Sequence, residues 1–495
     1  MKKNEKKILM FSCTFLFAFF IITNGLLADN LQKPQKADVI IADGTPAAII
    51  AAGDIIKSRK NEDKQPLVKA KNASDTFSRV TYRDISVVID TPVLSIINPM
   101  IPNEKLTVGG ATADIKGFNS VAIQTAIDAL HYKCNGGTVI LMQGNFDITF
   151  PVRLYDNIVL IGSGEKTVLK KCKGFSSPFA LDADYGELKI TVKDPSGFSP
   201  GMGVAIYDET QRLAWGVTTA RITLIKGNDI YIDNYLLCDY HTDKKGTISN
   251  SCSVITAIGA ENIRIANLMV DGSKESNEMI DGCRAGGVYL HKVRNAVVEN
   301  IIVKNFNSDG ISWQITENVT VRNCEVFGCT SSGLHPGTGS PFTTVEGNNS
   351  HDNDGFGLFV CWRVRDGFVR NNSFHKNGIS GISTGHKDTD MLFADNHIYE
   401  NGADGIQMRG ELPLNAPHRN IFKNNLIENN GMKGKACGLS INCKAEGVVL
   451  EDNIIRSTGK GHQAAAVFLK ANIMPVELKN NKISGHPDGE VISEK

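Results

Sequence analysis

The sequence lacks the features by which several classes of protein are recognised. Its 53 basic residues are balanced by 53 acidic residues, so no net charge draws the chain to nucleic acid or to an anionic membrane. Its cysteines form neither a CxxC pair nor a zinc-binding spacing. No apolar run after residue 22 is long enough to cross a bilayer. We therefore expect no nucleic-acid partner and no membrane span in the mature chain.

The start of the chain has the pattern of a targeting signal. Four lysines within the first seven residues precede an apolar run from Ile8 to Ile22, and Ala28 offers a cleavage site. This pattern predicts a bacterial-type signal peptide over residues 1–28 and export to the periplasm or the extracellular space. An uncleaved anchor and a lipoprotein modified at Cys13 are the alternatives.

Export permits disulfide bonds among the cysteines that follow the leader. We expect most of these cysteines to be small apolar core residues. The expected disulfide participants are Cys324, Cys329, Cys437 and Cys443. The sequence assigns no pairing among them.

Residues 29–103 form an N-terminal extension without a sustained period, whereas residues 104–188 show a specific order of elements. Asn119 and Ser120 can cap a helix from Val121 to about Tyr132. A strand follows over residues 138–142, and then Gly144. This order resembles the N-terminal cap and first coil of pectin-lyase-like proteins. The resemblance implies an all-β fold, the right-handed parallel β-helix, with an N-terminal capping helix.

Residues 189–250 interrupt this pattern with short apolar strands. Two of them, at 222–225 and 230–233, are joined through Lys226-Gly-Asn-Asp, which is typical of a hairpin turn. We expect a small antiparallel β insertion here.

Residues 251–488 repeat with a period of about two dozen residues. A glycine precedes a short apolar strand every 23 or 24 residues, at Gly287, Gly310, Gly333, Gly357, Gly381 and Gly405. An asparagine recurs after a second strand, at Asn300, Asn323, Asn348, Asn372, Asn396, Asn425, Asn453 and Asn481. This period fits coils of three short strands that stack about 4.8 Å apart around one continuous core.

Alignment of the coils on the glycine predicts which side chains face outward, because successive strand residues alternate between the two faces. Two places after the glycine come Tyr289, Ser312, His335, Phe359, Ser383 and Gln407. Four places after it come His291, Gln314, Gly337, Cys361, Gly385 and Arg409. We call these two rows the outward columns. Their polar groups predict a track for a polysaccharide or oligosaccharide, although a plain solvated sheet face would also be polar.

The repeats also resemble those of mannuronan C5-epimerases and related periplasmic β-helices. The resemblance covers residues 318–396 and includes Ser332-Gly-Leu-His-Pro-Gly-Thr-Gly-Ser and His351-Asp-Asn. The family has Asp-Pro-His at a position where this chain has His335-Pro336-Gly337. The resemblance therefore implies a uronate-containing glycan as the substrate class but does not carry over the catalytic residues.

Abstraction of the C5 proton of a uronate requires a base, a proton donor and a cation beside the carboxylate. We assign His335 as the base, Tyr289 as the acid and Arg409 as the cation. On the stacking distance, Tyr289 lies two coils from His335, roughly 9.6 Å, and Arg409 three coils, roughly 14 Å. Calcium is an alternative to the arginine in this superfamily, and His351-Asp352-Asn353-Asp354 is the one tight acidic cluster. The expected substrate-binding residues are His291, Gln314, Trp362, Arg363, His386, Lys387, Gln407 and Glu411.

The sequence thus predicts a polysaccharide lyase or C5-epimerase, with two alternatives. Hydrolysis requires two carboxylates about 5 to 9.5 Å apart, and the acids on this side, Asp309, Asp404 and Glu411, offer no good pair. A non-catalytic glycan-binding or adhesive β-helix would explain polar columns without any acid or base. The sequence does not predict the oligomeric state.

Overall fold

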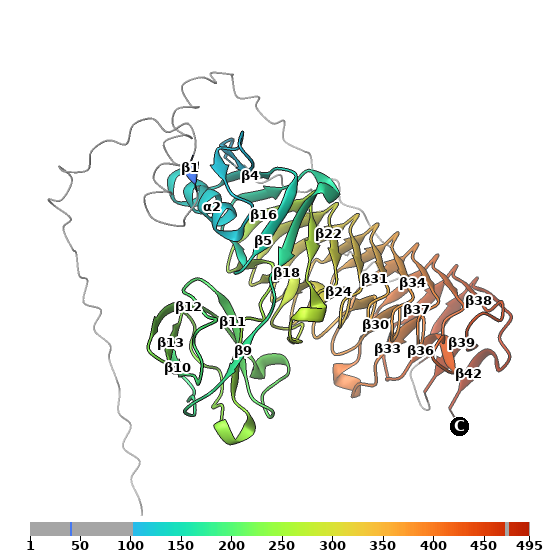
Figure 1. The fold of residues 1–495 in the computed structure, drawn as a ribbon. Helices are drawn as coiled ribbons and strands as arrows, with labels where there is room; N and C mark the ends of the chain where they lie inside the picture. Colours follow the sequence, from blue (N-terminus) through green and yellow to red (C-terminus); the bar gives the residue numbers. More distant parts are fainter. Residues whose placement is uncertain (1–39, 42–101, 471–474, 495) are drawn as a thin grey trace, which may run out of the picture. The chain divides into compact units, whose positions relative to one another are not determined.

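Three long parallel β-sheets run through the part of the chain that the computed structural model describes, which is residues 40–41, 102–470 and 475–494 (Figure 1). Each coil, or rung, contributes one strand to each sheet. The parallel β-helix predicted from the repeats is confirmed. The predicted leader and nearly all of the 29–103 extension lie outside the described residues. None of the described helices has the length and apolar character needed to span a membrane.

The first sheet has 14 strands and the other two have 11 each. The first sheet, in chain order, consists of β1 (Ile40–Ile41), β2 (Lys105–Gly109), β3 (Ile115–Lys116), β4 (Gly137–Leu141), β7 (Ile158–Ile161), β16 (Glu261–Ala266), β19 (Arg294–Glu299), β22 (Glu317–Arg322), β25 (Thr344–Glu346), β28 (Phe368–Arg370), β31 (Leu392–Ala394), β34 (Ile421–Lys423), β37 (Val449–Glu451) and β40 (Glu477–Lys479). The second sheet consists of β6 (Val152–Leu154), β15 (Ile255–Ile258), β18 (Gly286–His291), β21 (Asp309–Gln314), β24 (Leu334–Gly337), β27 (Leu358–Phe359), β30 (Ile382–Thr384), β33 (Ile406–Met408), β36 (Ala436–Ile441), β39 (Gln463–Leu469) and β42 (Gly489–Ser493). The third sheet consists of β5 (Gly144–Ile148), β8 (Thr167–Lys171), β17 (Met269–Asp271), β20 (Ile302–Lys304), β23 (Glu325–Phe327), β26 (Asn349–His351), β29 (Ser373–His375), β32 (His397–Tyr399), β35 (Leu426–Glu428), β38 (Ile454–Arg456) and β41 (Lys482–Ser484).

Helix α2 (Ser120–Cys134) covers the start of the solenoid core, as the sequence predicts. The Asn119 side chain accepts a hydrogen bond from the Ala122 amide at 2.9 Å, which caps the first turn. Asn135 ends the helix in the left-handed conformation, with φ 59°. One face of the helix is buried and joins the main hydrophobic cluster, through residues that include Ile123, Ile127 and Leu130.

The β insertion is an antiparallel sheet of six strands with its own hydrophobic cluster (green in Figure 1). Its strands are β9 (Ser176–Pro178), β10 (Lys189–Thr191), β11 (Gly203–Tyr207), β12 (Thr218–Lys226), β13 (Asp229–Ile232) and β14 (Thr247–Ser249). The expected hairpin is β12–β13, with Gly227 at φ 60° in its turn. The sheet also includes β9, which precedes the predicted start at residue 189, because β9 pairs with β14 at the end of the insertion.

The register of the second sheet confirms the alignment on the repeating glycine. Val288 pairs with Ile311, Ile311 with Leu334, and Leu334 with Leu358 along successive rungs. All of them are fully buried in the main hydrophobic cluster. Residues at the same place in the repeat therefore lie directly above one another.

The predicted asparagine row occupies two different positions in the rung. Asn300 and Asn323 occupy left-handed bends, with φ 52°. Asn348 lies one position farther on, where its side chain bonds the amide of Cys324. From there a buried column bonds rung to rung through Asn348, Asn372, Asn396, Asn425, Asn453 and Asn481. The single row expected from the sequence is corrected in this respect, because the bend and the residue after it both favour asparagine.

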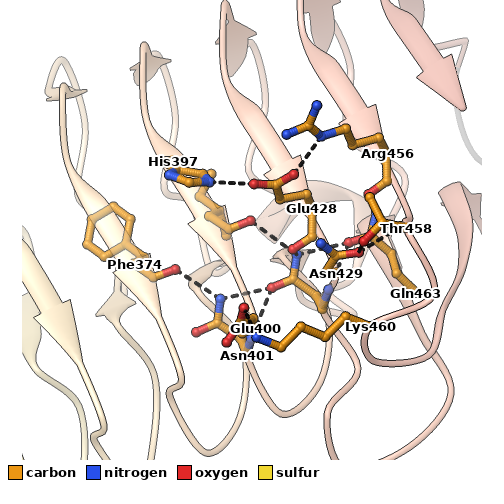
Figure 2. A network of polar contacts seen from close by, with 12 residues as sticks. Phe374, His397, Glu400, Asn401, Glu428, Asn429, Arg456, Thr458, Lys460 and Gln463 are labelled. Carbon is orange, nitrogen blue, oxygen red and sulfur yellow. Dashed lines mark hydrogen bonds and ion pairs between the residues drawn. The ribbon is translucent and has the colours of Figure 1, made fainter.

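A second buried column follows the third sheet and is not predicted from the sequence. Its members are Asn353, Asn377, Asn401, Asn430 and Gln463, and each amide bonds the next along the stack. Part of this column is visible in Figure 2, where the Asn401 side chain bonds the Phe374 carbonyl and Gln463 is the last member of the column. The inward polar groups of these turns are hydrogen-bonded to one another. These bonds offset the cost of removing the groups from water, so the turns can be buried.

Candidate functional site

The outward columns are largely covered, which corrects the expectation of an open track. Tyr289, Ser312 and His335 are neighbours on β18, β21 and β24. They point away from the core, yet their exposed fractions are only 5%, 0% and 3%. Alternation along a strand predicts the direction of a side chain but not what lies over it.

The cover over these residues is a segment that precedes β18, residues 281–285. The Ser312 hydroxyl donates to the Gly282 carbonyl at 2.7 Å, and the Tyr289 hydroxyl donates to the Cys283 carbonyl at 2.8 Å. Gly282 packs so closely that an added methyl group would lie 1.5 Å from Asp309 Oδ2. The covering segment thus closes the N-terminal part of the columns, and the Tyr289 hydroxyl is bonded to this segment.

The β insertion holds the cover in place. Arg284 donates hydrogen bonds to the carbonyls of Ala214 and Trp215, at 3.2 and 2.9 Å. Its guanidinium also lies 4.2 Å from the centre of the Trp215 ring, a cation–π contact. Both contacts involve the short 3-10 helix η2 (Ala214–Gly216). The insertion is therefore linked to the site through one arginine.

A buried ion pair joins His335 to Asp309. His335 Nδ1 lies 2.6 Å from Asp309 Oδ2, and Asp309 Oδ1 accepts a hydrogen bond from the Ser332 amide at 2.7 Å. Burial opposes protonation of the imidazole, but the Asp309 carboxylate outweighs it and raises the pKa of His335 to about 10. At neutral pH the covered imidazole is therefore a cation.

The second ring nitrogen of His335 is buried and makes no hydrogen bond to a nitrogen or oxygen atom of the described residues, although the Cys361 thiol is close enough to interact with the imidazole and helps to raise its pKa. The Cys361 thiol and the Phe359 ring of the next rung lie beside the imidazole, the ring centres of His335 and Phe359 being 5.0 Å apart. A cationic N–H donor that is oriented by a carboxylate and otherwise unused can donate a proton to a substrate.

Arg409 reaches back toward His335 across two rungs. It donates to the Ser383 hydroxyl and to the Val360 carbonyl, both at 2.9 Å. Its guanidinium carbon lies 4.6 Å from the centre of the Phe359 ring, on which His335 also packs. Side-chain length therefore brings the two cations closer than the roughly 14 Å expected from the stacking distance.

Asp388 positions Arg409. Its carboxylate lies 3.4 Å from the guanidinium and accepts hydrogen bonds from the amides of Gly385 and Val364, at 2.8 and 3.1 Å. Burial raises the pKa of Asp388 to about 6, against the opposing effect of Arg409. No pattern in the sequence selects Asp388, because it lies beyond the strand in a loop of variable composition.

Several predicted binding residues gather at the exposed end of the columns, after the second sheet. The Trp362 side chain is half-exposed, with 47% of its surface accessible, and stacks on His386 at 4.8 Å between ring centres. His386 in turn bonds Glu411 at 3.2 Å. Arg363 and Lys387 lie beside them on the same loops and are exposed. We call these five residues the loop patch.

The backbone of this patch has the left-handed bend that other rungs also have. Trp362, Arg363 and Lys387 have φ values of 64°, 65° and 57°, and Lys292 and Ile315, directly after β18 and β21, have φ 55°. The bend is therefore a feature of the rung and does not by itself mark a functional site.

The remaining predicted residues are divided between the two regions. His291 is half-buried near Trp215, and its partial burial lowers its pKa to about 4. Gln314 is fully buried, with its side-chain amide above Gly337 and its carbonyl oxygen unpaired among the described residues. Gln407 is half-buried and its oxygen lies 3.5 Å from the Ser383 hydroxyl. Each acid considered for hydrolysis has a different partner, since Asp309 pairs with His335, Glu411 bonds His386, and Asp404 accepts hydrogen bonds from Ser440 and Cys437.

The described residues do not support calcium at the acidic turn. Asp352 is bonded to His351 at 2.6 Å, and Asp354 is paired with Lys274 at 3.5 Å. No group of three or more histidine, cysteine or acidic side chains in the described ranges has the geometry of a metal site. All ten cysteines after the leader are free thiols in the structure, including the four expected as disulfide participants. Cys324, Cys329 and Cys443 instead pack in the hydrophobic core.

Comparison with solved structures finds other proteins of similar architecture. The A-module of the Azotobacter vinelandii mannuronan C-5 epimerase AlgE4 is 16% identical, with a TM-score of 0.48 over 75% of this chain and 92% of that one. An enzymatically active domain of a bacteriophage CBA120 tailspike protein is 10% identical, with a TM-score of 0.47 over 79% of this chain and 52% of that one. A glycoside hydrolase is 10% identical, with a TM-score of 0.46 over 76% of this chain and 96% of that one. No curated protein matches the sequence.

Two family models match adjoining parts of the chain. Residues 360–473 match the right-handed β-helix region. Residues 107–359, more than half of the chain, match the model described as rhamnogalacturonase A/epimerase, pectate lyase-like. The chain therefore belongs to the rhamnogalacturonase A/epimerase, pectate lyase-like family.

Proposed function

We propose that this protein is an exported enzyme that acts on a uronate-containing polysaccharide by transferring the C5 proton, with elimination or epimerisation as the outcome. The observation that carries the proposal is the buried Asp309–His335 pair, whose free N–H lies on an outward column beside Arg409. The proposed export rests on the lysine-rich, apolar start of the chain.

The ion pair reverses the roles expected from the sequence. Because Asp309 raises the pKa of His335, the imidazole is protonated at neutral pH and acts as the donor instead of the base. Tyr289 then becomes the candidate base, and it must first be released from the Cys283 carbonyl. Burial raises the pKa of Tyr289, so its phenolate is accessible only when the covering segment opens.

Arg409 supplies the third requirement, a cation for the substrate carboxylate. Loss of the C5 proton places negative charge next to that carboxylate, so a fixed guanidinium stabilises the transition state. Asp388 and the Ser383 hydroxyl hold Arg409 in position. A sugar bound at the loop patch would rest against the exposed Trp362 ring and present its neighbour to Arg409.

The proposal is tested by incubating the purified chain with acidic glycans in deuterated water. Incorporation of deuterium at C5 reports epimerisation, whereas elimination leaves no hydrogen on C5 and is reported by the ultraviolet absorbance of the new double bond. His335→Gln should lower the rate about a hundredfold or more, the usual effect of removing a general acid. The control is His397→Gln, a 41% exposed histidine on the third sheet.

New reducing ends with neither exchange at C5 nor ultraviolet absorbance from a double bond would refute the proposal in favour of hydrolysis. Glycan binding without any chemical change, on every substrate tested, would refute it in favour of the non-catalytic module. A rate that is equal in His335→Gln and His397→Gln would place the chemistry elsewhere.

A further inference from the structure

A separate groove lies on the turns that follow the third sheet. It has a volume of about 410 Å³ and is lined by the turns of three successive rungs together with a loop from the fourth. Glu400 forms part of its wall and bonds Lys460, as Figure 2 shows. These turns project from the third sheet and contain none of the residues assigned to proton transfer.

Stacked glycines form the floor of the groove. A methyl group on Gly402 would lie 2.2 Å from the Gly378 carbonyl oxygen, and one on Gly378 would lie 2.1 Å from the Asp354 carbonyl oxygen. Any side chain at these two positions would collide with the backbone of the neighbouring rung. The two glycines therefore let these turns stack closely, and they form a strip of backbone that lines the groove.

Lys433 lies along this strip. Its loop folds back over the preceding rung, with the Lys433 amide bonded to the Gly402 carbonyl at 2.9 Å. Its Cδ atom lies 3.1 Å from the site of a methyl group on Gly402, and its Nζ atom 3.0 Å from that of one on Gly378. The ammonium group is therefore held over the middle of the floor, beside the turn that carries Lys376.

The ion pairs of the lining residues leave positive charge uncompensated. Two lining carboxylates are paired with cations, since Asp354 pairs with Lys274 and Glu400 with Lys460, whereas Asp352 bonds His351, which compensates its charge only when protonated. Lys376 and Lys433 form no ion pair among the described residues. These two ammonium groups against the one carboxylate of Asp352 favour an anionic ligand.

We propose that this groove binds one acidic sugar residue of an oligosaccharide, with its carboxylate on Lys376 and Lys433. The half-exposed Met432 side chain, which lines the same groove, offers an apolar wall for the C–H face of a pyranose ring. Glu400 and Asp352 can accept hydrogen bonds from the ring hydroxyls. The site is a binding site only, and it stands whether or not His335 proves to be catalytic.

Calorimetric titration of the full chain with a galacturonate hexamer tests this site. Lys433→Met keeps the apolar stem and removes the charge, and it should weaken binding about fivefold or more, as expected for loss of a partly exposed charge-assisted hydrogen bond. The matched control is Lys435→Met, because Lys435 lies in the same loop but is paired with Asp488 outside the groove. Unchanged affinity in Lys433→Met, or equal loss in the control, would overturn the proposal.

Two further ligands identify what the site recognises. The methyl-esterified hexamer has the same sugar without the charge and should bind the native chain about fivefold or more weakly than the acid does. Lys433→Met should bind this ester as tightly as the native chain does, because the contact that the substitution removes is already absent. Equal binding of the ester would overturn the role of the carboxylate. If inorganic sulfate bound as tightly as the hexamer, the groove would be a simple anion site and the sugar assignment would be overturned. The rate of C5 exchange in Lys433→Met should be unchanged on short substrates, which keeps this result separate from the test of His335.

Discussion

Replacing Asn396 by alanine tests how much the buried asparagine column contributes to stability. The Asn396 side chain makes four hydrogen bonds. It accepts from the amide and the side chain of Asn372, at 3.1 and 2.9 Å, and it donates to the Val369 carbonyl and to Asn425 Oδ1, at 2.9 and 3.0 Å. The alanine variant strands the buried Asn372 amide, which has no other bond partner among the described residues.

The expected loss follows from these contacts. A stranded buried donor costs about 1 to 3 kcal/mol, and each of the other three lost bonds about 0.5 to 1.5 kcal/mol. The free energy of unfolding should therefore fall by at least about 2.5 kcal/mol. The control is Asn481→Ala at the half-exposed end of the column, where solvent can replace its bonds to Asn453 and Leu450. We expect a loss below about 1 kcal/mol there.

Guanidinium unfolding, followed by the emission of the buried Trp313 and by circular dichroism, measures both losses. The midpoint should fall in Asn396→Ala with an unchanged slope. A loss in Asn396→Ala no larger than in Asn481→Ala would refute the reasoning, because it would mean that the buried bonds add nothing beyond what water supplies.

Three further predictions concern the covered site. The raised pKa of His335 contributes to the free energy of unfolding, and this contribution is complete below about pH 6.5 and is lost as the pH rises through about 10. Thermal unfolding at a series of pH values should therefore show stability declining over this range. The variant Asp309→Asn should flatten that decline. Gly282→Ala should force the cover off Asp309, which would be seen as faster modification of His335 by diethyl pyrocarbonate; an unchanged rate would show that the cover is not the barrier. Arg284→Ala should also speed this modification by releasing the cover from Trp215, whereas an unchanged rate would show that the β insertion does not hold it.

The sequence predicts the rung well because local and repeated signals determine it. A glycine before an inward apolar residue recurs at a fixed interval, so Val288, Ile311 and Leu334 can be aligned from the sequence alone. The helix over residues 120–134 has a capping asparagine at each end and an apolar stripe. Such features depend on neighbours in the chain or on the same place in the next rung.

The site is harder to predict because it depends on contacts that do not repeat. Residues 281–285 cover Tyr289 and Ser312 through backbone carbonyls. Every residue has a backbone carbonyl, so such contacts cannot be predicted from residue types. Arg409 reaches Phe359 because of the conformation of its side chain, which stacking distances do not show. The His335–Asp309 pair joins strands of neighbouring rungs, whereas the sequence marks Asp309 only as a possible hydrolytic acid.

Because the rungs are evenly spaced, whole rungs can be added to the solenoid or removed from it. The rung that begins at Phe368 pairs residue by residue with those before and after it, so its deletion would bring Glu346 next to Ala394 with every column still aligned. Such a deletion would shorten the span from Phe359 to Arg409 by one rung, about 4.8 Å. The distance between the side chains of two rungs can therefore change by whole rungs while each rung keeps its own structure.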